Sequence, residues 1–397
     1  MDTSVTRDSV QDKALEISKS HFRCGLGISM GVGKTRIALE HMKSFYNSFS
    51  TFLVVAPKKT IFKSWIDECE KTGYTHLLDH ITFVTYVSLK KKNPNDYDIV
   101  YLDECHSLKY THKKFLANFD GRILGLTGTP PTRNLSEKGE MVNTFCPMVY
   151  KFSVDNATDN NILNNYKIYI HHLQLSKTKN LKKKNKKGGF WYTSEVLDYD
   201  YYSRRALTNQ QTKSSKKGYM TRIMRMKSMM DYPTKETYTK NLLKRYAGKD
   251  KKVIVFANTK EQADRMSSYS YHSSNPNSND NLEYFSDGRI NVLSCVLQLS
   301  EGVTIPDLQS GIILHAYGNN RKSAQRIGRL LRLNPNMTSN CHILCYADTI
   351  DKNWVMAAVK DFSMNKIYHV EVKNNQPFRV VKHGNNSNKI WPKFYKK

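Results

Sequence analysis

The feature that most restricts the fold of this chain is the turn Gly31-Val32-Gly33-Lys34-Thr35, which follows the apolar run Cys24–Ser29 and opens a helical pattern. Two glycines let the backbone N–H groups of such a turn close around a phosphate, and the start of a helix adds a favourable dipole. Lys34 is expected to reach the β- and γ-phosphates, and the Thr35 hydroxyl to bind Mg²⁺. A strand, a phosphate-binding turn and a helix in this order predict an α/β domain with a parallel sheet.

A second element of the same chemistry follows later in the chain. The apolar run Ile99–Leu102 reads as a strand and ends in Asp103-Glu104-Cys105-His106. A carboxylate at the end of a strand is well placed to meet a metal ion. We therefore expect Asp103 to hold Mg²⁺ through water, and Glu104 to orient and deprotonate the attacking water. The turn and the acidic pair together predict a nucleoside triphosphatase.

Strand-like and helix-like segments alternate in two blocks, which is typical of domains built on parallel sheets. With 397 residues, the chain exceeds the size at which one hydrophobic core stops growing, so two or three domains are expected. We predict a first domain over residues 1–150, a basic linker and insertion over residues 151–250, and a second domain over residues 251–397. The segment Lys167–Leu175 is expected to form an edge strand of the second sheet.

The net charge of +27 is unevenly distributed along the chain. Residues 1–150 hold 20 lysines and arginines against 16 acidic residues, whereas residues 151–250 hold 22 against 8. Such an excess predicts a polyanionic partner. In this middle block, Lys182–Lys187 precedes Phe190-Trp191-Tyr192, a mixture found on single-strand-binding surfaces, although a disordered tether is the alternative for the lysine run. Stacking on bases is one role for the three aromatic rings, but because neighbouring strand residues point to opposite faces, we expect the rings to pack.

The chain has no apolar run near the roughly 20 residues that a membrane-spanning helix needs, and its first residues lack the pattern of a signal peptide. Its seven cysteines are scattered and form neither a Cys-x-x-Cys pair nor a zinc-binding spacing. These observations predict an intracellular protein with reduced thiols and no membrane partner.

Further segments occur in the order found in superfamily 2 helicases and translocases, so the chain resembles that superfamily over nearly its whole length. The most specific of them is Gln325–Arg332, which resembles motif VI, followed by Leu126–Pro130, which resembles motif III. The remaining matches are Gln11 for the adenine-reading glutamine, Ala56–Lys59 for motif Ia, Thr85–Ser88 for motif Ib, Val255–Asn258 for motif IV, and Glu301–Asp307 for motif V.

The resemblance implies two tandem RecA-like domains, each a mostly parallel sheet flanked by helices, that bind ATP and Mg²⁺. On a helix, Arg329 and Arg332 share one face, so both guanidinium groups are expected to reach the γ-phosphate from the second domain. Gln325 belongs to the same motif, and Gly302 of motif V is expected to line the nucleotide pocket. Hydrolysis then requires the domains to close and product release lets them open, which is the stroke of a motor.

DNA is the expected substrate, because the Thr-Gly-Thr-Pro form of motif III differs from the Ser-Ala-Thr form of RNA-remodelling DEAD-box enzymes. The turn resembles the MGLGKT loop of Swi/Snf-type translocases, which also lack the first glycine that Ile28 replaces here. Motif VI is more similar to that of phage recombination-repair and nucleotide-excision-repair helicases. The alternatives are an RNA helicase or transcript-release factor, and an ATP-clamped annealing protein with little motor activity.

The nucleic acid is expected to lie across both domains and to be held mainly by its phosphates, so binding should be salt-sensitive and largely independent of sequence. The candidate contacts are Lys58, Lys59, Thr85 and Asn258. A composition rich in lysine, asparagine and tyrosine favours a phage or another virus as the source. We expect the protein to act as a monomer.

Overall fold

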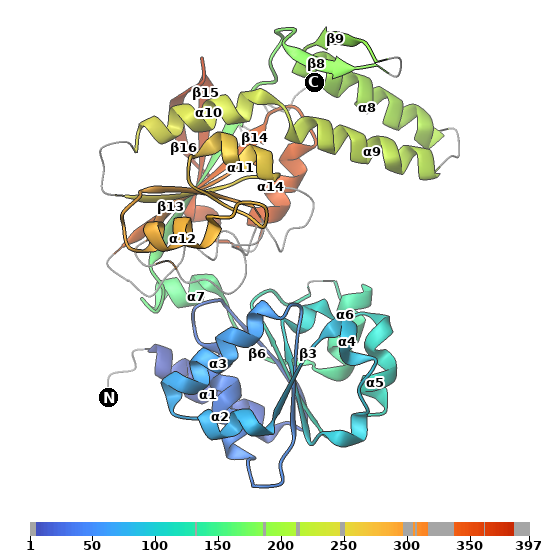
Figure 1. Cartoon of the computed structure of the whole chain (residues 1–397), viewed down its shortest axis with the longest axis vertical. Helices are drawn as coiled ribbons and strands as arrows, with labels where there is room; N and C mark the ends of the chain where they lie inside the picture. The colour runs from blue at the N-terminus through green and yellow to red at the C-terminus, as the bar shows by residue number, and fades with distance from the viewer. Residues whose placement is uncertain are drawn as a thin grey trace. The chain divides into compact units, whose positions relative to one another are not determined.

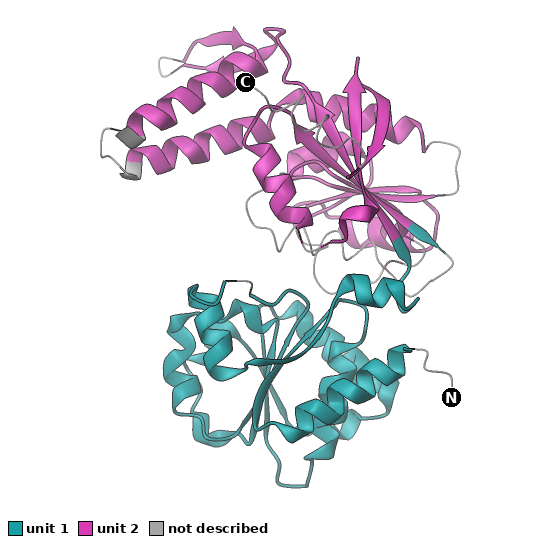
Figure 2. Ribbon diagram, turned by 180° about the vertical axis from the view of Figure 1, so that it is seen from behind, with its two compact units in different colours: residues 1–165, 300–304, 331–338 teal, residues 166–299, 305–330, 339–397 magenta. Residues whose placement is uncertain are grey.

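The computed structural model of the chain describes residues 5–131, 133–185, 188–211, 215–246, 251–296, 305, 308–316, 337–360 and 362–384. The described residues divide into two compact units (Figure 2). The first comprises the described residues up to Asn165 together with Met337 and Thr338, and the second comprises the other described residues from Tyr166 onwards. Each unit has its own sheet and its own buried core.

The first unit is built on a six-stranded sheet with the order β3-β2-β4-β5-β1-β6, in which every pairing is parallel. Its central strands are almost continuously apolar, because helices cover both faces of a parallel sheet. Val54, Tyr101 and Leu126 are fully buried, for example. The strands are β1 (Arg23–Ile28), β2 (Phe52–Ala56), β3 (Ile81–Thr85), β4 (Ile99–Asp103), β5 (Arg122–Thr127) and β6 (Met148–Phe152).

Helices flank this sheet on both sides. Figure 1 shows α1, α2 and α3 on one side and α4, α5 and α6 on the other. Phe115 of α5 and Phe145 of α6 belong to one apolar core with the strand residues Val100 and Leu102. The helices are α1 (Arg7–Ser20), α2 (Lys34–Ser44), α3 (Thr60–Thr72), α4 (Tyr86–Leu89), α5 (Lys113–Ala117), α6 (Glu137–Phe145) and α7 (Val154–Asp159), with short 3-10 helices at Thr75–His80, Pro94–Asp96, Cys105–Ser107 and Tyr110–His112.

The second unit contains an eight-stranded sheet with the order β11-β12-β10-β13-β14-β7-β15-β16. Strands β15 and β16 pair antiparallel, and the other described pairings are parallel. The strands are β7 (Asn165–Leu173), β10 (Lys252–Phe256), β11 (Ser270–Tyr271), β12 (Val292–Cys295), β13 (Leu308–Ile313), β14 (Thr338–Tyr346), β15 (Ile367–Lys373) and β16 (Gln376–Lys382).

The prediction that Lys167–Leu175 forms an edge strand is wrong. Most of this segment forms β7, which lies between β14 and β15 in the interior of the sheet. The hairpin of β15 and β16 comes from the far end of the chain and pairs with the side of β7 that would otherwise be an edge. Strand β7 is covered on both faces, because Ile168 and Ile170 are buried on one face and His171 and Leu173 on the other.

Helix α10 covers part of the second sheet. Its Tyr238 and Leu242 belong to one apolar core with Val253 and Val255 of β10 and Leu344 of β14. The helices of this unit outside its projecting part are α10 (Pro233–Lys244), α11 (Lys260–Met266), α12 (Ser278–Ser286) and α14 (Asp351–Val359), with a 3-10 helix at Met364–Lys366.

Residues 181–230, which we call the arm, project from the second unit as a hairpin and two helices that lie side by side (Figures 1 and 2). The prediction that Phe190, Trp191 and Tyr192 pack is wrong, because these residues are 58%, 49% and 60% exposed. A hairpin of only two strands has no second layer against which both faces are buried. The arm consists of β8 (Leu181–Lys184), β9 (Phe190–Thr193), α8 (Glu195–Gln211) and α9 (Ser215–Met230).

The expected fold class is confirmed, since both units carry a mostly parallel sheet flanked by helices. Within the described ranges, we find no helix that combines the length and the apolar character needed to cross a membrane. All seven cysteines are buried, and none of them forms a disulfide bond.

Candidate functional site

The predicted phosphate-binding turn connects β1 to α2 in the first unit. Gly31 and Gly33 have φ angles of +88° and +103°, which residues with a side chain rarely adopt. A methyl group on Gly33 would also lie only 2.4 Å from Nε2 of Gln11. The backbone therefore requires glycine at both positions. Lys34 and Thr35 form the first two residues of α2, at the helix end that favours anions.

Helix α1 braces this turn. Gln11 lies on the buried side of α1, and its Nε2 donates a hydrogen bond to the carbonyl oxygen of Val32 over 2.6 Å. Arg7 Nε donates to the same oxygen over 3.2 Å. The side chain predicted to read adenine thus lies directly against the phosphate-binding turn.

Asp103 ends β4, and its side chain is held from two directions. Its Oδ2 accepts a hydrogen bond from the indole Nε1 of Trp65 over 2.9 Å, and its Oδ1 accepts one from the backbone N–H of Glu104 over 2.9 Å. The hydroxyl of Tyr86 donates to the backbone carbonyl oxygen of Asp103 over 3.0 Å. These three neighbours fix both the carboxylate and the end of the strand.

Glu104 has a left-handed backbone, with φ of 50° and ψ of 52°, which is costly for a residue with a side chain. This conformation ends the strand and starts the 3-10 helix Cys105–Ser107. It leaves Glu104 Oε2 3.2 Å from Nδ1 of His106, which itself lies 2.7 Å from Oγ1 of Thr127. His106 therefore connects Glu104 with the end of β5, where motif III begins.

Strands β4, β5 and β1 are neighbours in the sheet, so the segments that follow them meet at one edge. A methyl group on Gly128, which follows β5, would lie 3.5 Å from Nζ of Lys34. Open α/β sheets bind their ligands at the carboxyl ends of the strands. The structure therefore brings Lys34, Asp103 and Glu104 together at the edge where a nucleotide is expected.

Burial, together with the negative charge of Glu104, raises the pKa of the Asp103 carboxyl to about 6. The hydrogen bond from Trp65 and the positive charge of Lys34 lower this pKa. The Trp65 hydrogen bond and the Lys34 charge together do not offset the effects of burial and of the Glu104 charge. A divalent cation would supply the missing charge, and the oxygens of Asp103 and Thr35 are donors that Mg²⁺ prefers. The residues present fit such a site.

The predicted contacts to nucleic acid in the first unit lie farther along the same sheet edge. Lys58 and Lys59 are exposed after β2, and Thr85 ends β3. In the second unit, Asn258 follows β10, and its Nδ2 lies 2.8 Å from Sδ of Met230. Four other predicted site residues, Gly302, Gln325, Arg329 and Arg332, lie outside the described residues.

Sequence reasoning assigned no role to Trp65, Tyr86 or His106. A buried tryptophan usually finds a hydrogen-bond acceptor, but nothing in the spacing of the sequence names Asp103 as the acceptor of Trp65. Tyr86 belongs to motif Ib, and His106 is the last residue of Asp103-Glu104-Cys105-His106. The sequence therefore marks both positions, but it does not show which residues they contact.

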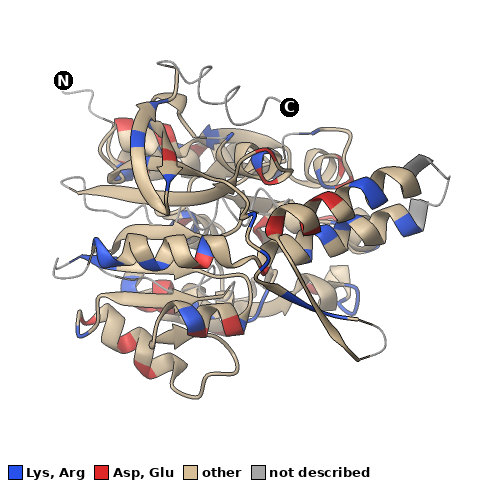
Figure 3. Cartoon of the chain, turned by 90° about the horizontal axis from the view of Figure 1, so that it is seen from above, with Lys and Arg blue, Asp and Glu red and all other residues tan. Residues whose placement is uncertain are grey.

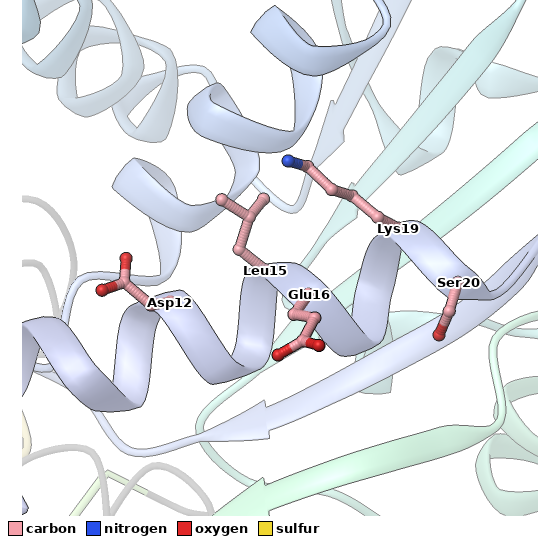
Figure 4. A pocket seen from close by; sticks show the side chains of 5 residues that line it. All are labelled: Asp12, Leu15, Glu16, Lys19 and Ser20. Carbon is pink, nitrogen blue, oxygen red and sulfur yellow. The ribbon is translucent and has the colours of Figure 1, made fainter.

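A hollow of about 440 Å³ lies elsewhere in the first unit, on the exposed side of α1 (Figure 4). Its position separates it from Gln11, which occupies the buried side of the same helix. The hollow is therefore not part of the nucleotide site. Its lining residues are Asp12, Leu15, Glu16, Lys19 and Ser20.

Two family models match this chain. The model described as "Type III restriction enzyme, res subunit" matches residues 5–132, which include the phosphate-binding turn, Asp103 and Glu104. The model described as "Helicase conserved C-terminal domain" matches residues 234–334, which include motifs IV, V and VI.

Among curated proteins, the DNA 3'-5' translocase XPB2 of Sulfurisphaera tokodaii is 26% identical over 330 residues, which cover 76% of this chain and 73% of that protein. The solved Hef helicase domain of Pyrococcus furiosus is 14% identical with a TM-score of 0.50, and the match covers 88% of this chain and 97% of that one. The DNA-bound type ISP restriction-modification enzyme LlaBIII is 12% identical with a TM-score of 0.59, covering 95% of this chain and 32% of that one.

At these identities, the two structural likenesses show the fold alone. The two family models together span more than half of the chain, and they occur in the order of an ATP-binding half and a helicase C-terminal half. Their ranges contain the phosphate-binding turn, the Asp103-Glu104 pair and the segment Gln325–Arg332. The chain therefore belongs to the superfamily 2 helicases and translocases, which are ATPases.

Proposed function

We propose that this protein is a DNA translocase or helicase driven by ATP hydrolysis. One observation carries the proposal: Lys34, Asp103 and Glu104 meet at the carboxyl edge of three neighbouring parallel strands, and the segments after β2 and β3 continue the same edge. A nucleotide site and basic residues on one sheet place ATP hydrolysis beside a surface that can bind the phosphates of a nucleic acid.

In the proposed site, backbone N–H groups of Gly31–Gly33 and the ammonium group of Lys34 hold the β- and γ-phosphates, while Gln11 reads the adenine. Asp103 and the Thr35 hydroxyl would hold Mg²⁺, which neutralises phosphate charge when it is bound. Hydrogen bonds from Trp65 and the Glu104 backbone keep the Asp103 carboxylate in one orientation before the nucleotide arrives.

Glu104 orients a water molecule towards the γ-phosphate and accepts its proton as the bond between the β- and γ-phosphates breaks. Arg329 and Arg332 of motif VI supply positive charge to the transferring phosphoryl group, supported by Gln325, and Gly302 lines the pocket. Because these four residues belong to the second half of the chain, the two halves must approach each other for each turnover.

Two hydrogen bonds of the first unit support coupling between strand binding and hydrolysis. Helix α3 begins directly after the exposed Lys58 and Lys59. Its Trp65 donates a hydrogen bond to the Asp103 carboxylate. Tyr86 directly follows Thr85 and bonds to the Asp103 backbone. A DNA strand would contact these two loops and Asn258 through its phosphates. Its binding would therefore displace Trp65 and Tyr86, which contact Asp103, the proposed metal ligand.

DNA is the proposed substrate for two reasons. The curated relative is named a DNA 3'-5' translocase, and one structure of the same fold is described as bound to DNA. The Thr-Gly-Thr-Pro form of motif III also differs from that of RNA-remodelling enzymes. None of the seven cysteines forms a disulfide bond, which is compatible with an intracellular site of action.

The test is the ATPase rate measured with duplex DNA, single-stranded DNA and RNA side by side, each at low and moderate salt. We expect DNA to stimulate the rate and RNA to do so weakly or not at all. Stimulation by RNA alone would replace the proposal with an RNA helicase. A rate that no nucleic acid changes would replace it with the annealing protein that uses ATP only as a clamp.

Three variants test the assigned roles in the same assay. Lys34→Ala should lose ATP binding, because the phosphates lose their main cationic partner. Glu104→Gln and Arg329→Ala should keep ATP binding and lose turnover. A Glu104→Gln protein with normal turnover would refute the water-positioning role, whatever the nucleic-acid specificity proves to be.

A further inference from the structure

The hairpin of the arm presents aromatic and basic side chains to solvent on one face. Lys182 is opposite Tyr192 and Lys184 is opposite Phe190 in its antiparallel register. Directly opposed residues share a face of a sheet, and so do alternate residues of one strand. These four side chains therefore form a single face, which we call the hairpin face, and all four residues are exposed.

The opposite face of the hairpin is directed towards the rest of the arm. Leu181 and Lys183 alternate with the exposed lysines, and Leu181 belongs to the apolar core of the second unit. Lys183 Nζ lies 3.1 Å from Oδ2 of Asp198 and 2.6 Å from Oγ of Ser228. Because Lys183 ties the hairpin to α8 and α9, the outward direction of the hairpin face is fixed.

The base of the arm is braced by buried hydrogen bonds. Asp198 also accepts a bond from the Tyr232 hydroxyl over 2.9 Å. Glu195, which is fully buried, accepts bonds from the backbone N–H groups of Ser176 and Thr234, each over 2.9 Å. A buried network of this kind holds α8 in one orientation, so the hairpin face is presented on a firm support.

The exposed surface combines stacking area with positive charge. Lys182 Nζ lies 4.1 Å from the centre of the Phe190 ring. Figure 3 shows lysines and arginines along the hairpin and along α8 and α9. Rings that stack on bases, interleaved with cations that meet phosphates, are the chemistry by which proteins hold single strands without reading their sequence.

The geometry points to the hairpin face as a docking surface for single-stranded DNA. Phe190 and Tyr192 stack on bases, and Lys182 and Lys184 contact the flanking phosphates. The inference deepens the proposed DNA-dependent motor and rests on it. An apolar protein surface fits this face less well, because it would remove Lys182 and Lys184 from water without offering them an anionic partner.

The decisive experiment compares two short oligonucleotides of equal length and charge, oligo(dT) and an abasic strand, by fluorescence anisotropy. The wild-type protein should bind oligo(dT) more tightly, because only that strand has bases to stack. In Phe190→Ala/Tyr192→Ala, affinity for oligo(dT) should fall by about ten-fold per ring. Affinity for the abasic strand should stay the same, so the preference for bases should disappear.

The lysines are tested through salt dependence. Lys182→Gln/Lys184→Gln should lower the affinity for both oligonucleotides to the same extent. It should also reduce the slope of log affinity against log salt by about 1.4, because each phosphate contact with a single strand contributes about 0.7. The four substituted positions of the hairpin and the two positions of the control variant all lie on the surface. The thermal midpoint of unfolding should therefore not change in any of these variants. The matched control is Lys373→Gln/Phe378→Ala, which removes another exposed ring with a lysine 3.8 Å from its centre, on β15 and β16.

The outcomes separate this inference from the proposed function. If DNA stimulates the ATPase but the hairpin variant binds both oligonucleotides like wild type, the docking surface is wrong and the motor stands. Equal loss in the control variant, or tighter binding of an RNA strand than of oligo(dT), also overturns it. If no nucleic acid stimulates the wild-type ATPase, the proposed function fails before the arm is considered.

Discussion

Asp103 shows how much of the candidate site depends on single contacts. Its carboxylate lies beside Glu104 in a buried position, and both the burial and the neighbouring charge favour its protonated form. The indole of Trp65 and the backbone N–H of Glu104 each bind one of its oxygens. Each carboxylate oxygen still has capacity for one more contact, which a metal-bound water can use.

Trp65→Phe removes the indole donor and keeps an aromatic ring at a fully buried position. We expect the Mg²⁺ concentration for half-maximal ATPase activity to rise about ten-fold, because groups that orient a metal ligand usually contribute that much. Nucleotide affinity without metal should change little, and a Mg²⁺ titration with a parallel nucleotide-binding assay measures both. Trp354→Phe, a partly buried tryptophan of the second unit, is the control. An unchanged Mg²⁺ requirement would show that the indole only packs.

Strand β7 carries adjacent histidines that point to opposite faces of the second sheet. His171 Nε2 lies 2.9 Å from Nδ1 of His342 on β14, and His172 Nε2 lies 3.0 Å from Nδ1 of His369 on β15. His383 Nδ1 lies 2.8 Å from Nε2 of His369. Burial lowers the pKa of each of these imidazoles, to about 4 for His342 and about 3 for His369.

The second unit should therefore lose stability in mild acid. Below about pH 6.5 the unfolded chain binds protons at these histidines and the folded chain does not, so the free energy of unfolding falls as the pH falls. His342 alone contributes about 2 kcal/mol between pH 7 and pH 5. His342→Gln should flatten this dependence, which thermal unfolding at several pH values measures. Equal slopes for both proteins would contradict the buried neutral state.

Helices α10 and α14 are joined by a buried ion pair. Lys235 Nζ lies 2.6 Å from Oδ2 of Asp351, and both side chains are almost fully buried. The same Nζ donates to the carbonyl oxygen of Leu344 over 2.9 Å, and the backbone N–H of Tyr346 donates to Asp351. The pair therefore links two helices to the end of β14.

Lys235→Met should lower the free energy of unfolding by about 3–5 kcal/mol, because it leaves the Asp351 carboxylate buried without its cation. Adding Asp351→Asn removes that charge and keeps an oxygen for the Tyr346 N–H, so the double variant should be more stable than Lys235→Met. Chemical denaturation of both proteins measures the difference. A double variant less stable than the single one would show that the carboxylate is not what makes the substitution costly.

The distribution of charge along the chain matches the roles proposed for its parts, ATP binding in the first part and DNA binding in the later part. Residues 1–150 are nearly balanced, with 20 basic and 16 acidic residues, and this range contains the phosphate-binding turn and the acidic pair. Most of the net charge of +27 lies later in the chain, including the arm. A chain with this distribution should use local contacts for ATP and long-range attraction for DNA.

The DNA concentration for half-maximal ATPase stimulation should therefore rise steeply with salt. For about six phosphate contacts, an increase of roughly a thousand-fold is expected between about 50 and about 200 mM salt. Lys58→Ala/Lys59→Ala should reduce the slope by about 1.8, since each contact with duplex DNA contributes about 0.9. The basal rate without DNA serves as the control and should vary far less. A salt-independent half-maximal concentration would rule out phosphate contacts as the main source of affinity.

The fold class and the positions of the nucleotide elements could be read from the sequence because they depend on neighbouring residues. Glycines at Gly31 and Gly33, followed by Lys34, specify a turn through local backbone freedom. The apolar run before Asp103 specifies a buried strand through its own composition. Both statements hold without any knowledge of what lies across the sheet.

Other features depend on which distant segments become neighbours, and the chain order does not reveal this. Trp65 meets Asp103 only because α3 packs beside β4. Strand β7 lies in the sheet interior because the hairpin of β15 and β16 pairs with it. Phe190 and Tyr192 of β9 remain exposed because a two-stranded hairpin has no layer to cover its outer face. Partners across a sheet are set by strand pairing and packing between segments far apart in the chain, whereas the chemistry of a turn is set within a few residues.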